Sequence, residues 1–178
     1  MNGELALAAP VEVPMEDRLA ALFDAHEDRL YRLARRLVQR PEDARDLVQE
    51  TFLRAATTLK RVPVGFSREE AWLVRVLLNI QRDRWRRMAV RERVGLPAAG
   101  ASASDPESAL MTKRAVWSAL DRLHPKRRAI VVMHELEGMS LAKIASLLGI
   151  GHVTVQWHLS MGRRELKRLL QPLVGEIR

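Results

Sequence analysis

The stretch from Ser140 to Leu159 constrains the fold of this chain more than any other, and it reads SLAKIASLLGIGHVTVQWHL. Apolar positions on both sides of Gly149 repeat at helical spacing, and Gly149 itself can take the positive φ that reverses a chain tightly. Ala145 stands where two helices would cross closely, which suits a small side chain. These features predict two short helices near a right angle, with the second shaped for the major groove of DNA.

The second of these helices, expected over about residues 152–171, carries polar and basic side chains outside its apolar face. Glutamine can bond adenine at two points, threonine can meet a thymine methyl group, and a basic end can hold phosphates. An ordinary helical hairpin with a solvated face is the alternative, but the glycine turn and the basic end favour DNA. The candidate contacts to DNA are His152, Thr154, Gln156, Trp157, Ser160, Met161, Arg163 and Arg164.

The charge balance agrees with a polyanionic partner. The 178 residues include 30 Lys and Arg against 22 Asp and Glu, which gives a net charge of +8. Such an excess favours nucleic acid, because each neutralised phosphate releases a condensed counterion.

No catalytic or metal-binding constellation is apparent in the sequence. The chain has no cysteine and five scattered histidines, and it has no glycine-rich phosphate loop. His134-Glu135 begins like a zinc-protease helix, but the second histidine would fall at Gly138. We therefore expect no enzyme activity and no cofactor.

The localisation follows from what the sequence lacks. No apolar run approaches the roughly 20 residues that a membrane span needs. The first residues are acidic and lack the basic start of a secretory signal. We expect a soluble, cytoplasmic protein without membrane insertion.

Helix signals occur along the whole chain, and strand signals are nearly absent. The expected fold is all-α, with two small helical domains joined by a flexible linker and a helix-turn-helix at the end of the second. Residues 1–15 are expected to form a mobile arm, 16–90 the first domain, 91–105 a linker rich in Gly, Ala, Ser and Pro, and 106–172 the second domain.

Several residues predict where helices begin and end. Pro41 and Pro125 suit the first position of a helix, and Ser140 suits an N-cap. Ser67 and Glu70 have the spacing of a capping box, and Pro172 is expected to end the last helix.

The helix that begins at Pro41 is expected to be amphipathic. Its apolar face consists of Ala44, Leu47, Val48, Thr51, Phe52 and Ala55. Its other face carries Asp43, Asp46, Gln49 and Glu50, and an acidic and amide surface of this kind suits a basic partner.

Two segments of the first domain resemble a known family. DARDLVQETFLRA at residues 43–55 and AWLVRVLLNIQRDRWRR at residues 71–87 resemble the second conserved region of bacterial sigma factors of the extracytoplasmic-function type. Residues 119–140 are similar to the domain of that family that binds the minus-thirty-five promoter element. The resemblance covers nearly all of residues 18–170 and implies a transcription initiation factor.

The resemblance also implies partners and roles for particular residues. Asp43, Asp46, Gln49 and Glu50 would bind the clamp helices of core RNA polymerase. Asn79 would line the pocket for a flipped base of the minus-ten element, and Arg82, Asp83, Arg84, Arg86 and Arg87 would lie along the promoter DNA. Trp85 suits either base stacking or core packing. An antisigma factor is a further expected partner.

Two positions of the recognition helix depart from the family. Gln156 stands where a basic residue is common, and Trp157 stands where a small one is common, so the upstream element read by this chain is expected to differ. A free-standing helix-turn-helix regulator is the main alternative, and a polymerase-binding inhibitor is another. The Asp46–Phe52 segment argues against the free-standing regulator.

Overall fold

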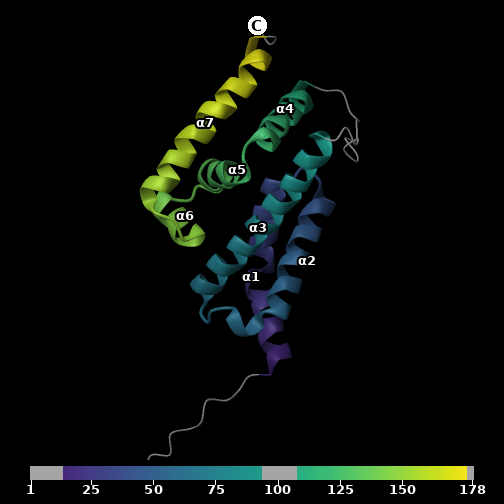
Figure 1. Cartoon of the computed structure of the whole chain (residues 1–178), viewed down its shortest axis with the longest axis vertical. Helices are drawn as coiled ribbons and strands as arrows, with labels where there is room; N and C mark the ends of the chain where they lie inside the picture. The colour runs from purple at the N-terminus through teal and green to yellow at the C-terminus, as the bar shows by residue number, and fades with distance from the viewer. Residues whose placement is uncertain (1–13, 94–107, 176–178) are drawn as a thin grey trace, which may run out of the picture.

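The structure is a computed structural model that describes residues 14–93 and 108–175 (Figure 1). Nearly all of the expected amino-terminal arm and most of the expected linker lie outside the described residues. Within those residues every regular element is a helix, which confirms the all-α prediction. The elements are α1 (Met15–Leu37), α2 (Pro41–Thr57), the 3₁₀ turn η1 (Leu59–Arg61), α3 (Phe66–Arg93), α4 (Ser108–Arg122), α5 (Pro125–Val131), the π-helical segment η2 (Val132–Leu136), α6 (Leu141–Leu148) and α7 (His152–Gly175).

The first group of helices, α1 to α3, packs through faces that the apolar spacing predicted. All six residues assigned to the apolar face of α2 are buried. Leu30, Leu33 and Leu37 of α1 are also fully enclosed and meet this face. Because the buried positions recur every three or four residues, each helix contributes one continuous stripe to the core.

The start of α3 differs from the predicted capping box. The first helical turn closes on the Gly65 carbonyl, and Glu69 accepts a hydrogen bond from the Gly65 N–H at 3.3 Å. Glu70 is instead buried and pairs with Arg29 and Lys143. The predicted capping box of Ser67 and Glu70 was therefore wrong, because Glu70 forms ion pairs with distant residues instead of capping the helix.

Two predicted helix boundaries also moved. Helix α3 continues to Arg93, three residues into the expected linker, and α7 continues past Pro172 to Gly175. A proline removes one donor and crowds the preceding turn without always breaking a helix.

The second group, α4 to α7, contains the predicted helix-turn-helix. Ser140 caps α6 by accepting a hydrogen bond from the Lys143 N–H at 3.2 Å. Gly149 ends that helix with φ +65°, the left-handed conformation that glycine adopts without strain. Pro125 occupies the first turn of α5, as predicted.

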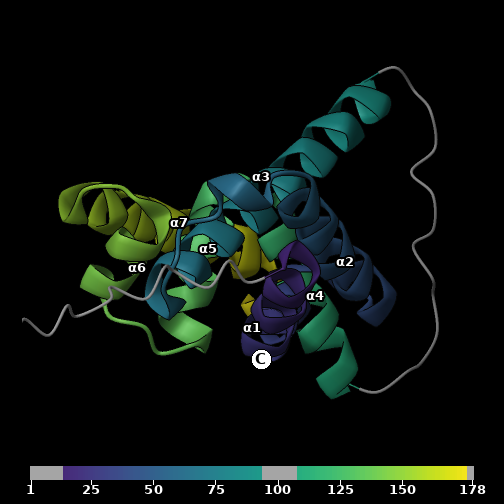
Figure 2. The ribbon, with the colours of Figure 1, turned by 90° about the horizontal axis from the view of Figure 1, so that it is seen from below.

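The two groups are docked against each other in this structure. Helix α3 contacts α1 and α2 on one side and α5 and α6 on the other (Figures 1 and 2). Glu137, which follows η2, pairs with Arg29 at 2.7 Å and with Arg36, both from α1. Arg75 of α3 donates to the Leu147 carbonyl at 3.1 Å. Apolar contacts and ion pairs between distant segments therefore join the two halves of the chain.

Gly162 sets the close approach of α5 to α7. A Cβ atom at Gly162 would lie 2.6 Å from Cγ2 of Val131, a buried and branched side chain. The two helices can therefore touch at this point only because the side chain is absent.

We expect the substitution Gly162→Ala to destabilise the chain by about 1–2 kcal/mol, because overpacking outweighs the better helix propensity of alanine. In a Val131→Ala background the same substitution should be neutral or stabilising, since the obstructing methyl group is gone. Urea unfolding of the four proteins measures both effects. A stabilising Gly162→Ala change in the wild-type background would contradict the packing described.

Candidate polymerase and DNA interfaces

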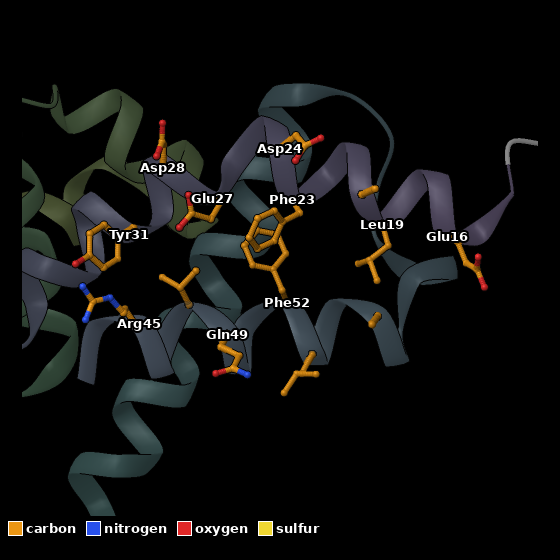
Figure 3. Close-up of a pocket in the computed structure, with 14 residues that line it drawn as sticks. Glu16, Leu19, Phe23, Asp24, Glu27, Asp28, Tyr31, Arg45, Gln49 and Phe52 are labelled. Carbon is orange, nitrogen blue, oxygen red and sulfur yellow. The ribbon is translucent and has the colours of Figure 1, made fainter. Parts of the chain in front are cut away.

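An apolar groove runs between α1 and α2 (Figure 3). Its volume is about 1060 Å³. The rings of Phe23 and Phe52 meet in it with centroids 4.8 Å apart. Phe23 is 44% exposed and Leu53 60% exposed, so apolar side-chain surface faces solvent at the groove.

Acidic side chains border this groove along α1. Glu16, Asp24, Glu27 and Asp28 all lie among its lining residues, together with Arg45 and Gln49 of α2 (Figure 3). An apolar floor with an acidic border is complementary to a helix that has apolar side chains flanked by lysine or arginine.

The residues predicted to bind polymerase differ in their surroundings. Gln49 lines the groove, whereas Glu50 accepts hydrogen bonds from Arg54 of its own helix and Arg84 of α3, each at 2.9 Å. Burial alone would raise the pKa of Glu50, but the two arginines outweigh it and hold that pKa below its ordinary value. Asp46 is exposed and Asp43 is half-buried.

The predicted minus-ten residues lie along the second half of α3. Asn79, Arg86 and Arg87 are exposed, and Arg82 and Asp83 are half-buried. Arg82 and Asp83 also pair with each other at 3.5 Å. Arg84 turns toward Glu50, so α3 is linked to the polar face of α2.

Trp85 occupies the boundary between the two groups of helices. Its ring meets His124 edge to face, with centroids 5.8 Å apart. The sequence left base stacking and core packing open for Trp85. In the structure its ring packs at the contact between the two groups of helices, and not inside the core of one group.

The predicted minus-thirty-five residues lie on α7, at positions other than Val155 and Leu159, which are buried. Arg163 pairs with Glu135 of η2 at 2.6 Å, which ties the recognition helix to the segment before α6. The remaining residues of the set are exposed, except for the half-buried Met161; they are His152, Thr154, Gln156, Trp157, Ser160 and Arg164.

A positive environment surrounds His158 of this helix and His124, which directly precedes α5. Partial burial, followed by the charges of Arg127, Arg86 and Lys126, lowers the pKa of His124. Partial burial, Lys126 and Arg127 likewise lower the pKa of His158. Cations drawn from α3 and α5 thus converge here, a distribution that favours a bound polyanion.

Some residues at these surfaces carried little signal in the sequence. Phe23 has the spacing of an ordinary core position and Leu53 lies outside the apolar face of α2, and only the structure shows that both are exposed at the groove. Glu135 and Arg127 reach α7 from other elements, so no local spacing could connect them to it. Leu53 follows Gln49 by four residues, which was the one available hint.

The described residues contain no group of three or more potential metal ligands. None of the helices in the described ranges is long and apolar enough to cross a membrane.

Two family models match the chain in order. The model of sigma-70 region 2 matches residues 22–91, and that of sigma-70 region 4 matches residues 113–166. The first match covers most of the groove and nearly all of α3, and the second covers α5, α6 and most of α7. A match to region 2 is not expected for a free-standing helix-turn-helix regulator.

Curated relatives give the same result. The ECF RNA polymerase sigma factor SigE of Mycolicibacterium smegmatis is 36% identical, and the match covers 84% of this chain but 60% of SigE. The RNA polymerase sigma factor CarQ of Myxococcus xanthus is 32% identical over 91% of this chain and 94% of its own length. The ECF sigma factor SigM of Mycobacterium tuberculosis (strain Erdman) is 36% identical over 95% of this chain and 84% of SigM.

Two solved structures share the fold. CnrH, solved in complex with the cytosolic domain of CnrY, has 26% identity and a TM-score of 0.58 over 88% of this chain and 90% of its own. The sigma factor RpoE of Bartonella quintana, solved with the anti-sigma factor NepR, has 23% identity and a TM-score of 0.56 over 88% of this chain and 96% of RpoE. With two matched regions and full-length relatives above 30% identity, the chain belongs to the family of extracytoplasmic-function sigma factors.

Proposed function

We propose that this chain binds core RNA polymerase, directs it to specific promoters and helps to open the duplex. The observation that carries the proposal is the pairing, in one chain, of an acidic-bordered apolar groove with an exposed recognition helix, each lying mostly within its matched sigma region. Residues 16–90 act on polymerase and the minus-ten element, and residues 106–172 act on the minus-thirty-five element. The role is recognition and strand opening, without a catalytic group.

Polymerase docks on α2 and on the groove beside it. Asp43, Asp46 and Gln49 supply polar contacts, and the exposed Leu53 supplies an apolar anchor. Glu50 already contacts two arginines, so its main contribution is to hold Arg84 in place. The docking helix and the minus-ten segment are therefore mechanically connected.

Strand opening depends on the second half of α3. Asn79 receives an extruded base of the minus-ten element, and Arg82, Asp83, Arg84, Arg86 and Arg87 line the path of the backbone. Taking a base out of the stack costs a few kcal/mol, so contacts at both elements must combine to supply it. Upstream contacts come from α7, where Gln156 and Trp157 distinguish this chain from its family.

The docked arrangement is not the one that reads a promoter. By their positions, minus ten and minus thirty-five, the two elements are about 25 base pairs apart, or roughly 85 Å of duplex at about 3.4 Å per base pair. In the structure, Trp85 of α3 touches His124, which directly precedes α5, and α5 packs on α7. The two groups of helices must therefore separate when both elements are bound. We expect an antisigma factor to hold the docked form.

Binding to core polymerase tests the docking surface. We expect Leu53→Ala to weaken binding of the full chain by about ten- to a hundredfold, which corresponds to the loss of one buried leucine. Asp46→Lys should weaken it as well, because it reverses a charge facing a basic partner. Val64→Ala is the matched control, since Val64 is 69% exposed but lies outside the groove. Unchanged affinity for both Leu53→Ala and Asp46→Lys would remove the proposed docking surface.

A distance measurement tests the separation of the two groups. The chain has no cysteine, so Lys60→Cys and Lys167→Cys give two unique labelling sites on exposed residues. We expect the label distance to increase when polymerase and promoter bind. In the free chain Glu137→Arg should increase it too, because the new charge would face Arg29 and Arg36.

The control for this measurement is Glu135→Gln, which breaks a pair inside the second group and should leave the distance in the free chain unchanged. An unchanged distance in the promoter complex would show that the docked form itself reads the DNA.

A further inference from the structure

Arg127 lies against the recognition helix at its point of closest approach to α5. The absent side chain of Gly162 brings the two backbones together, and a Cβ atom there would be 3.7 Å from both Cβ and the carbonyl oxygen of Arg127. From this point the Arg127 side chain can extend along the surface of α7 in contact with residues on both sides of Gly162.

The guanidinium group of Arg127 is held from two directions. Nη1 donates to Oε2 of Glu165 at 2.9 Å, on the carboxy-terminal side of Gly162. Cζ lies 5.7 Å from the centroid of the Trp157 ring, on the amino-terminal side. Both members of the Arg127–Glu165 pair are mostly buried, with side chains 26% and 23% exposed. A partly desolvated cation beside an indole ring is an attractive contact.

Trp157 is therefore an ordered side chain, although it is 53% exposed on the face of α7 that points away from the core. Arg127 covers part of the ring, and His158 meets it edge to face with centroids 4.9 Å apart. The rest of the indole is free. An indole presents apolar surface and a single N–H donor, so it is poorly suited to bonding a base edge at two points.

We infer that Arg127, anchored by Glu165, is a positioning residue that fixes the Trp157 indole so that it packs on a thymine methyl group of the upstream promoter element. This inference rests on the proposed function, in which α7 reads that element. In the major groove the thymine C5-methyl is the apolar feature that distinguishes a base pair. Arg127 itself is occupied by Glu165 and Trp157, so it acts on specificity through the ring.

Replacing thymine by deoxyuridine removes only that methyl group. The probe is a duplex promoter selected from a library, randomised in the upstream element, by the wild-type chain with core polymerase. Each upstream thymine is replaced in turn, and the affinity of the complex is measured. For the wild type we expect about a fourfold loss at one position, the value of one buried methyl group.

The variants separate positioning from other roles. Trp157→Ala, Arg127→Ala and Glu165→Gln should each abolish the discrimination between thymine and uracil at that position. If Arg127 instead contacted a phosphate, Arg127→Ala would weaken all sequences equally and lower the salt dependence. That result, or full discrimination in Trp157→Ala, overturns the inference.

Two further controls keep the test decisive. Glu135→Gln breaks the comparable Arg163–Glu135 pair on α7 without touching Trp157, and it should keep the methyl discrimination. Arg127→Lys, which retains the charge, should recover part of the methyl discrimination. A purely structural role would instead show as reduced thermal stability with discrimination intact.

If the wild type selects no upstream sequence at all, the proposed function fails. If it selects one but no thymine methyl matters, only the inference fails.

Discussion

Helix α3 is the element on which the rest of the structure depends, because it packs against both groups of helices at once. Its first half contributes Leu73, Val74 and Leu77 to the core, and its other sides meet α2, α5 and α6. At about 1.5 Å per residue, a helix of this length can serve both groups along its axis. The same helix carries the predicted minus-ten residues. A change in domain packing would therefore also affect the segment at which strand opening would occur.

Charge pairs between distant segments define the geometry of this arrangement. Glu70 and Glu137 are largely enclosed and face arginine or lysine from the other group of helices. A buried carboxylate without its partner is costly, which gives the docked form a defined geometry. The net free energy gained by these pairs is small, because the separated charges would be hydrated. The pairs can therefore be exchanged when polymerase and DNA supply new contacts.

The sequence predicted the features that depend on neighbouring residues and missed those that depend on residues far away in the chain. The buried face of α2, the Ser140 cap and the Gly149 turn depend on residues within four positions of one another, and all three were predicted correctly. Glu70 was misjudged because its outcome depends on partners elsewhere in the fold, and Pro172 because a proline does not always end a helix. The split between Gln49 and Glu50 could not be predicted, since only the position of Arg84 shows that Glu50 is engaged. The contact of Arg127 with Trp157 joins two helices 30 positions apart and leaves no local pattern.

Transcription by purified core polymerase on a library of genomic fragments tests whether this chain is an initiation factor. With the full chain added, we expect transcripts with defined start sites whose upstream DNA shares two short sequence elements, near positions minus ten and minus thirty-five. Start sites identical to those of core polymerase alone, or no initiation, would contradict it.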